Sequence, residues 1–237
     1  MVNVSILAMA QARALGIEGQ RLREFGLSAL MHDIGKVCTP IEILQKTDRL
    51  TDDEFTIMKR HVIDGAEILR QTPEMPIMAP SVAFEHHLRL DGSGYPDIKR
   101  APLNLATMLT SIADVYDAMR SQRAYQQAFP TDRILAVMKR NDGTEFDQNL
   151  VRRFVQLIGI YPPGTVVRLD TNEVAIVLQV HAPDPHRPRV QVLRDPDGHP
   201  VPSRTTRHLW ETADGDDIHV TGPLDPADYD IDPLEYL

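Results

Sequence analysis

Two pairs of adjacent polar residues in the first half of the chain have side chains that are good metal ligands. His32 is followed directly by Asp33, and His86 by His87, and each pair lies at the end of an expected helix. Neighbouring side chains on a helix point about 100° apart, so such a pair can straddle a metal ion or two ions. Imidazole suits zinc, iron, copper or nickel, and carboxylate adds manganese or magnesium character. The alternative is an ordinary polar helix end, where His32 and Lys36 meet the helix dipole.

Two further candidate ligands lie within otherwise apolar helical patterns. His61 stands at the edge of an apolar stripe, where a lone histidine is more often a hydrogen-bonded core residue. Asp114 lies in SIADVYDAM, where a carboxylate costs free energy unless it is paired or bound to a metal. Asp117 is interpreted as a solvated acid and is not ranked with Asp114.

Together these side chains predict a site for two metal ions. The expected ligands are His32, Asp33, His61, His86, His87 and Asp114. We expect Asp33 to bridge the ions and hold them close, because a water between two such ions becomes acidic enough for in-line attack on phosphorus. Aromatic residues make up 5% of the chain, which gives little sign of an extended base-stacking surface and favours a small phosphoester substrate.

Helices must position these ligands, and the chain up to residue 159 has helical periodicity. The best-marked helix begins at Thr51, which forms a capping box with Glu54 and is followed by an apolar stripe that reaches Leu69. We expect helices over residues 2–15, 20–35, 51–69, 76–87, 105–119, 131–141 and 146–158. Residues 1–159 are therefore expected to form a mainly α domain.

The pattern changes near residue 160, where proline becomes frequent and β-branched runs begin. TVVRL and VAIVLQV flank a turn-like segment and predict a hairpin, and a third strand is expected over 189–194. Weaker strands are expected near 205–210 and 217–220. We therefore expect a small β-rich module over 160–222 and a loose acidic tail over 223–237. Covering the helical domain's apolar flank and forming a homodimer both remain open as roles for this module.

The formal charge of −9 arises in the C-terminal segment. Residues 211–237 hold nine acids and no Lys or Arg, whereas the rest of the chain has 25 acids against 25 bases. A body without excess positive charge gives no signal for nonspecific nucleic-acid binding. No stretch approaches the ~18 apolar residues of a membrane span, and the first residues lack a basic signal-peptide region. The single cysteine, Cys38, excludes an internal disulfide framework, so we expect a cytoplasmic protein.

Four segments, in this order, resemble the HD-GYP family, a branch of the HD-domain metal-dependent phosphohydrolases. They read MHDIGKV at 31–37, KRHVIDGAEIL at 59–69, HHLRLDGSGYP at 86–96 and IADVYDAMRSQRAY at 112–125. The resemblance covers roughly residues 1–159 and is specific because the segments form an ordered set. It implies an HD-type helical bundle and a bacterial enzyme of second-messenger signalling. Such enzymes hydrolyse cyclic di-GMP at a centre of two or three iron or manganese ions.

The resemblance also implies roles for individual residues. His32 and Asp33 correspond to the HD ligands, with Asp33 bridging, and Asp114 corresponds to the closing ligand of the first ion. His61, His86 and His87 correspond to the histidines of the second ion.

Other matching positions imply contacts with substrate. Lys36 matches a lysine that contacts the scissile phosphate, and Arg123 matches an arginine that binds a substrate phosphate. Gly94, Tyr95 and Pro96 form the GYP signature, which shapes the loop beside the site. This loop is also implicated in contacts with diguanylate cyclase (GGDEF-type) domains.

The sequence departs from the family pattern in three places. The family has a further metal-ligand histidine at the start of its first helix; the matching position falls just before Met1, and residues 1–31 contain no histidine. Leu88 stands where a glutamate usually follows the histidine pair, and Gln126 stands where a basic residue is common. We therefore expect two divalent ions, iron or manganese, with less support for a third.

The main hypothesis is a metal-dependent phosphodiesterase that converts cyclic di-GMP to pGpG, with GMP left open as a further product. One alternative is a catalytically impaired binding module that docks a partner through the GYP loop and the β-rich module. Another is a phosphohydrolase that acts on a different cyclic dinucleotide or on a nucleotide.

Overall fold

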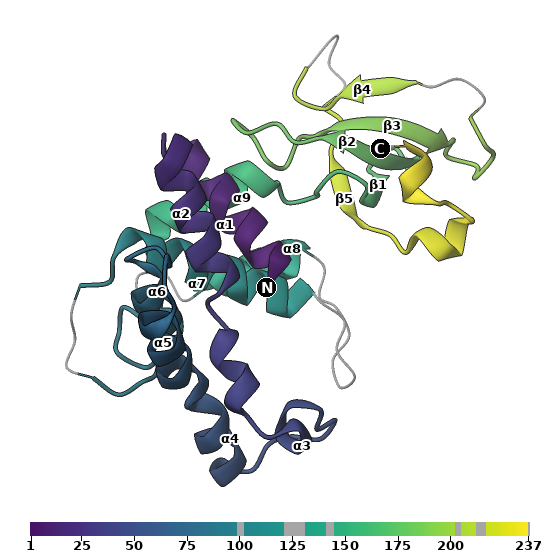
Figure 1. Ribbon diagram of the computed structural model, residues 1–237. Coiled ribbons are helices and arrows are strands. Elements are labelled where there is room, and N and C mark those ends of the chain that lie inside the picture. The colour runs from purple at the N-terminus through teal and green to yellow at the C-terminus, as the bar shows by residue number, and fades with distance from the viewer. Residues whose placement is uncertain (99–101, 121–130, 141–144, 202–204, 212–216, 237) are drawn as a thin grey trace. The chain divides into compact units, whose positions relative to one another are not determined.

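The computed structural model describes residues 1–98, 102–120, 131–140, 145–201, 205–211 and 217–236. Contacts divide the chain into a helical unit, Met1–Phe129 with Ala136–Val151, and a β unit, Pro130–Leu135 with Arg152–Leu237. Figure 1 shows the helices of the first unit and the sheet of the second. Among the residues described, no helix combines the length and apolar character needed to cross a bilayer.

The helices confirm the mainly α character expected for the first part of the chain. They are α1 (Val2–Ala14), α2 (Gly19–Leu30), the 3-10 helix η1 (Ile34–Cys38), α3 (Ile41–Leu44), α4 (Asp52–Lys59), α5 (His61–Gln71), α6 (Ala79–Glu85), α7 (Leu105–Arg120), α8 (Thr131–Arg140) and α9 (Gln148–Ile158). The second helix was expected to run through His32 and Asp33 and end near Gly35, but it ends at Leu30, so His32 and Asp33 lie in the tight turn that leads into η1.

Small residues let the helices of this unit approach closely. Ala8 and Ala12 of α1 are fully buried, and α1 packs against α2 and α7. Helix α5 packs against α6 and η1, where Gly35 is buried directly against the first turn of α5. These packings bring the turn after α2, the start of α5, the end of α6 and α7 together.

The structure corrects the helix expected over 51–69. The capping box at Thr51 is present, but the helix ends at Lys59 and a new one starts at His61, with Arg60 between them. At this interruption the Met58 carbonyl lies 2.7 Å from Nδ1 of His61. In a continuous helix that carbonyl would accept from the amide four residues later. The contact at the interruption fixes the direction of the His61 ring.

The β unit contains an antiparallel sheet of the predicted strands. They are β1 (Val166–Leu169), β2 (Val174–Gln179), β3 (Arg189–Arg194), β4 (Thr206–His208) and β5 (Val220–Pro223), in the order β4-β3-β2-β1-β5. The expected β1–β2 hairpin is confirmed, with Val167 opposite Ala175. Asn172 has a φ of 66°, a left-handed conformation that asparagine tolerates in turns. The β-branched runs are nearly fully buried, as a sheet core requires.

The acidic C-terminal segment, expected to be loose, has short elements of structure. It forms the 3-10 helices Pro226–Tyr229 and Pro233–Tyr236. The Tyr229 hydroxyl accepts a hydrogen bond from Arg168 (2.5 Å), and its carbonyl accepts one from Arg194 (2.6 Å). Two basic side chains of the sheet therefore hold this segment, which charge composition alone did not indicate.

Candidate metal centre

Three buried histidines of the helical unit are anchored in the same way. Nδ1 of each ring lies within hydrogen-bond distance of the carbonyl three residues earlier: His32 to Ala29 (2.7 Å), His61 to Met58 (2.7 Å) and His86 to Ala83 (2.9 Å). Because a carbonyl only accepts, Nδ1 must be the donor in each case, which leaves Nε2 directed into the cluster. Such anchoring fixes the tautomer and ring orientation of metal-ligating histidines.

Asp33 lies at the centre of these rings, and its two oxygens face different histidines. Oδ1 is 3.3 Å from Nε2 of His61 and 3.7 Å from Nε2 of His86. Oδ2 is 3.4 Å from Nε2 of His32 and 2.5 Å from the ammonium of Lys36. A carboxylate placed in this way has the arrangement of a bridging ligand.

The donor atoms form two overlapping groups within which all atoms lie no more than 4.8 Å apart. One group contains Asp33, His61, His86 and His87, and the other contains His32, His86 and Asp114. All six sequence-predicted ligands are therefore brought together. Asp117, which the sequence interpretation set aside, instead accepts a hydrogen bond from Asn3 at the surface.

Burial and close polar contacts determine the charges in the cluster. Burial opposes ionisation of Asp33, but the nearby rings of His32 and His86 outweigh it and hold the pKa of Asp33 far below its usual range. The pKa of Asp114 is likewise low, because the close approach of the His32 ring outweighs burial. Burial lowers the pKa of His32, yet the neighbouring carboxylates of Asp114 and Asp33 raise that pKa to about 9.

Two further histidines of the cluster, His61 and His87, are shifted towards the neutral form. Burial lowers the pKa of His61. Burial together with the neighbouring His86 lowers the pKa of His87 to about 2. A neutral imidazole keeps the lone pair with which it binds a metal, so these rings are prepared for ligation.

The cluster contains unsatisfied atoms that fit a cation. Nε2 of His32 and Oδ1 of Asp33 are buried without a hydrogen-bond partner among the residues that the structure describes. Nε2 of His61 lies 3.5 Å from Nε2 of His86, and both rings use their proton at Nδ1. Two lone pairs facing each other in a buried site are costly unless a positive charge lies between them. Imidazole nitrogens with carboxylate oxygens form a donor set for iron, manganese or zinc.

Arg89 supports the histidine pair and was missed by sequence reasoning. Its Nη1 donates to the carbonyls of His86 (3.3 Å) and Leu88 (3.1 Å) and to the hydroxyl of Ser111 on α7 (2.8 Å). Nε lies 3.6 Å from a carboxylate oxygen of Glu145. The signal that could have indicated Arg89 is a charged residue between two leucines, directly after the histidine pair, in HHLRL at 86–90.

We expect Arg89→Gln to weaken metal binding by roughly 10- to 100-fold, the usual effect of removing a residue that orients ligands. Without the guanidinium, the carbonyls of His86 and Leu88 lose a hydrogen-bond donor. The backbone that carries the histidine pair is then less fixed, and so is the direction of the two rings. Isothermal titration with Mn²⁺ measures the effect. Arg70→Gln is the matched control, because Arg70 is an exposed residue paired only with Glu67 among the residues described. Equal affinity in both variants would contradict the role of Arg89.

The GYP loop packs over the cluster, and its glycine is required by space. A Cβ on Gly94 would lie 2.0 Å from the carbonyl oxygen of His87, so only glycine fits there. The Tyr95 ring lies 4.5 Å from the His87 ring and 6.1 Å from the His61 ring, between centroids. Lys36 is partly exposed beside Asp33, and Arg123 lies outside the described residues.

Comparison with known proteins gives a family match for each unit. The chain matches the family model of the HD domain over residues 2–150 and that of a KOW domain associated with HD domains over residues 166–227. The sequence pattern predicted strands in the second unit but gave no sign of its similarity to a KOW domain.

Several characterised proteins resemble this chain. A cyclic di-GMP phosphodiesterase of Pseudomonas aeruginosa is 37% identical over 193 residues, which cover 81% of this chain and 46% of that protein. A cyclic di-GMP phosphodiesterase response regulator of Xanthomonas campestris is 36% identical over 151 residues, 63% of this chain and 40% of that protein. The chain thus spans less than half the length of these two relatives.

A solved structure supports the fold. The HDG"Y"P protein of Bdellovibrio bacteriovorus superposes with a TM-score of 0.54 at 20% identity, over 65% of this chain and 49% of that chain. The HD-domain match covers more than half of the chain, and the ordered ligand motifs meet in space around Asp33. The chain therefore belongs to the HD-domain family, in its HD-GYP branch.

Proposed function

We propose that this chain is a metal-dependent phosphodiesterase that hydrolyses cyclic di-GMP to pGpG. The observation that carries the proposal is the Asp33 carboxylate, whose two oxygens face different histidines at 3.3 to 3.7 Å. This arrangement suits a pair of cations held close together. When bound, two divalent ions supply an acidic water for in-line attack on phosphorus and neutralise phosphoryl charge.

The residues divide the work of holding ions and substrate. His61, His86, His87 and Asp33 hold one ion, and His32 and Asp114 with the shared Asp33 hold the other, for which we propose iron or manganese. The third group of candidate donors among the described residues, Asp195, Asp197 and His199, belongs to the β unit and not to this centre.

Lys36 is the cation that binds the substrate phosphate. Its ammonium is 40% exposed and is fixed by Asp33, so it can turn one hydrogen towards the carboxylate and others towards a phosphoryl oxygen. Arg123 is proposed to bind a second phosphate oxygen. Tyr95 and the GYP loop form the wall next to His87 and exclude water from that side.

Two partner proposals follow from the family. The GYP loop is proposed to contact diguanylate cyclase domains, and the β unit to act in self-association or in docking. Cyclic di-GMP is preferred as substrate because the relatives described above carry that activity in their names.

The protein is loaded with Mn²⁺ or, in the absence of oxygen, with Fe²⁺, and is expected to convert cyclic di-GMP to pGpG. Chromatography measures pGpG and also records whether GMP forms as a second product. Bis-(p-nitrophenyl) phosphate is the control substrate, because it reports the metal centre without any base. Hydrolysis of the control alone would contradict cyclic di-GMP as substrate, and 3′3′-cyclic GMP-AMP and cyclic di-AMP would then be compared. A fully loaded protein inert towards every diester would contradict enzymatic activity.

A further inference from the structure

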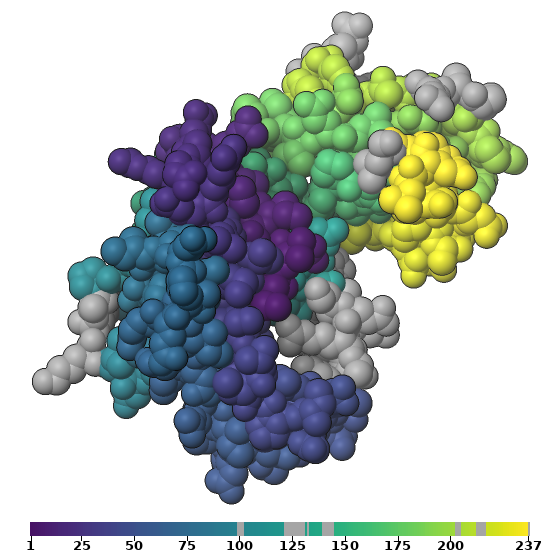
Figure 2. Space-filling model, viewed as in Figure 1, coloured from purple at the N-terminus to yellow at the C-terminus, as the bar shows by residue number. Residues whose placement is uncertain are grey.

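A pocket of about 630 Å³ lies between α3, the following loop and the start of α4. Its lining comprises Ile43, Leu44, Lys46, Asp48, Arg49, Leu50, Asp52, Phe55 and Met58. Figure 2 shows this segment as the blue lobe that projects from the helical unit. The volume is within the roughly 300–1,000 Å³ of small-ligand sites.

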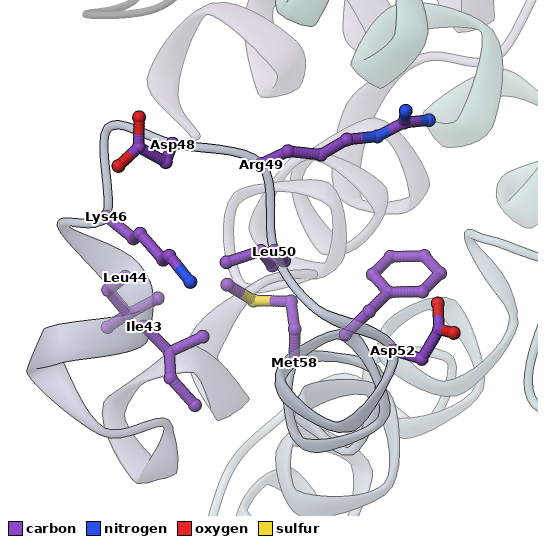
Figure 3. Close-up of a pocket in the computed structure, with 9 residues that line it drawn as sticks. Ile43, Leu44, Lys46, Asp48, Arg49, Leu50, Asp52 and Met58 are labelled. Atoms are coloured by element: carbon purple, nitrogen blue, oxygen red, sulfur yellow. The ribbon is translucent and has the colours of Figure 1, made fainter.

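The pocket has an apolar floor and a polar rim. Figure 3 shows Leu50 and Met58 near the middle of the lining residues, with the side chains of Arg49 and Asp52 both extending to the same side of them. The ammonium of Lys46 donates hydrogen bonds to both carboxylate oxygens of Glu54, at 2.6 and 2.8 Å. The side chains of Arg49 and Asp52 are exposed and have no ion-pair partner among the described residues. One cationic fork and one carboxylate are therefore available to a ligand.

The pocket is connected to the metal centre by one aromatic wall. Phe55, which lines the pocket and is 44% exposed, contacts Tyr95 edge to face with ring centroids 6.2 Å apart. Tyr95 in turn contacts the ring of the ligand His87 at 4.5 Å. The ammonium of Lys59 covers one face of Phe55, so a base meets that ring at its other face or its edge.

We propose that this pocket receives a guanine base of the substrate whose phosphate is at the metal centre. The inference rests on the proposed function, and it names Arg49 and Asp52 as determinants of base specificity. The carboxylate of Asp52 accepts hydrogen bonds from N1–H and the 2-amino group of guanine. The guanidinium of Arg49 donates to O6 and N7, the pairing that arginine makes with guanine elsewhere.

The same two side chains discriminate against adenine. Adenine has an acceptor at N1 and no 2-amino group, so it offers Asp52 no matching donors on that edge. Its 6-amino group also places a donor where Arg49 requires an acceptor. A site that leaves charged groups unpaired rejects the wrong base more strongly than an apolar pocket does.

The test measures binding, so it does not depend on turnover. Isothermal titration of the Mn²⁺-loaded chain compares GMP with AMP, which share the phosphate and differ in the base. Wild type is expected to bind GMP about tenfold or more tightly than AMP, the discrimination of a good bidentate base contact. Asp52→Asn and Arg49→Ala are expected to reduce that preference to within about twofold while AMP affinity stays constant, because only guanine uses these groups.

Matched controls exclude effects on the helix. Asp53→Asn removes the same charge from the same first turn of α4, and Arg70→Ala removes an exposed arginine of α5; neither residue lines the pocket. Both controls are expected to keep the wild-type preference. Equal binding of GMP and AMP by wild type, or an unchanged preference in both pocket variants, overturns the proposal. Inactivity towards cyclic di-GMP with a retained GMP preference would overturn the proposed function alone.

Discussion

Asp33→Ala is expected to remove metal binding and phosphodiesterase turnover together. Asp33 is the only carboxylate within the group of donors that includes His61 and His87, among the residues described, and its second oxygen faces His32. The variant therefore takes away negative charge from both halves of the centre. We expect turnover to fall by roughly 10³-fold or more, as for a member of a catalytic group that acts as a unit. Elemental analysis of the purified protein and hydrolysis of bis-(p-nitrophenyl) phosphate measure the two effects.

Asp117→Ala is the matched control for this experiment. Asp117 lies on α7 one turn from Asp114, but its carboxylate contacts only Asn3 at the surface in the hydrogen bonds described. The control is expected to keep full metal content and turnover. Circular dichroism checks that both variants fold. The check is needed because Asp33 is one of the groups that raise the pKa of buried His32, so its removal changes the charge of the core. Normal metal content and turnover in folded Asp33→Ala would contradict the assignment of the centre.

The grouping of the candidate ligands could be predicted from the sequence because the six residues are unusual as a set, although most of them have an ordinary interpretation when taken singly. Of the six, the carboxylate inside an apolar helix is costly unless it is paired or bound to a metal. His61 is different, because its ordinary interpretation as a hydrogen-bonded core histidine is also correct. The structure shows that Nδ1 makes that bond while Nε2 faces Asp33. His61 therefore fits both a role as a core histidine and a role as a candidate metal ligand. Sequence spacing alone does not distinguish these two roles.

The elements that orient the ligands could not be predicted in detail. The spacing of apolar residues from Phe55 to Leu69 is the same before and after Arg60, so the periodicity indicates one helix. The interruption depends on the His61 ring and the Met58 carbonyl, which a pattern of apolar residues does not record. Arg89 was missed for a related reason, because its partners Ser111 and Glu145 are distant in sequence.

The β unit shows the same division between local and long-range information. Runs of β-branched residues predicted β1, β2 and β3, and the turn between the first two predicted their pairing. The pairing of β1 with β5 joins residues about fifty positions apart, such as Val167 with Pro223. Composition predicted a loose tail, but Tyr229 is held by hydrogen bonds from Arg168 and Arg194 of the sheet. These arginines are distant in sequence, so the composition of the tail does not indicate the contacts.

Gly35 is the position at which packing of the fold and geometry of the centre depend most directly on each other. It lies two residues after Asp33, and a Cβ there would be 2.0 Å from the His61 carbonyl oxygen. The same atom would be 2.4 Å from the amide nitrogen and 2.9 Å from Cα of Gly65. All three neighbours are backbone atoms of α5, so no side chain can move aside.

Gly35→Ala is therefore expected to force α5 away from η1, which separates His61 from Asp33. We expect the free energy of unfolding to fall by about 3 kcal/mol, at the upper end for overpacking, with a drop of roughly 10 °C in melting temperature. Thermal unfolding followed by circular dichroism, together with metal content, measures the change. Gly26→Ala is the control, because the atoms nearest to its Cβ belong to the flexible side chain of Met9, which can shift. An unchanged melting temperature and full metal loading in Gly35→Ala would show that α5 can yield, and that the close approach of Gly35 does not set the position of His61.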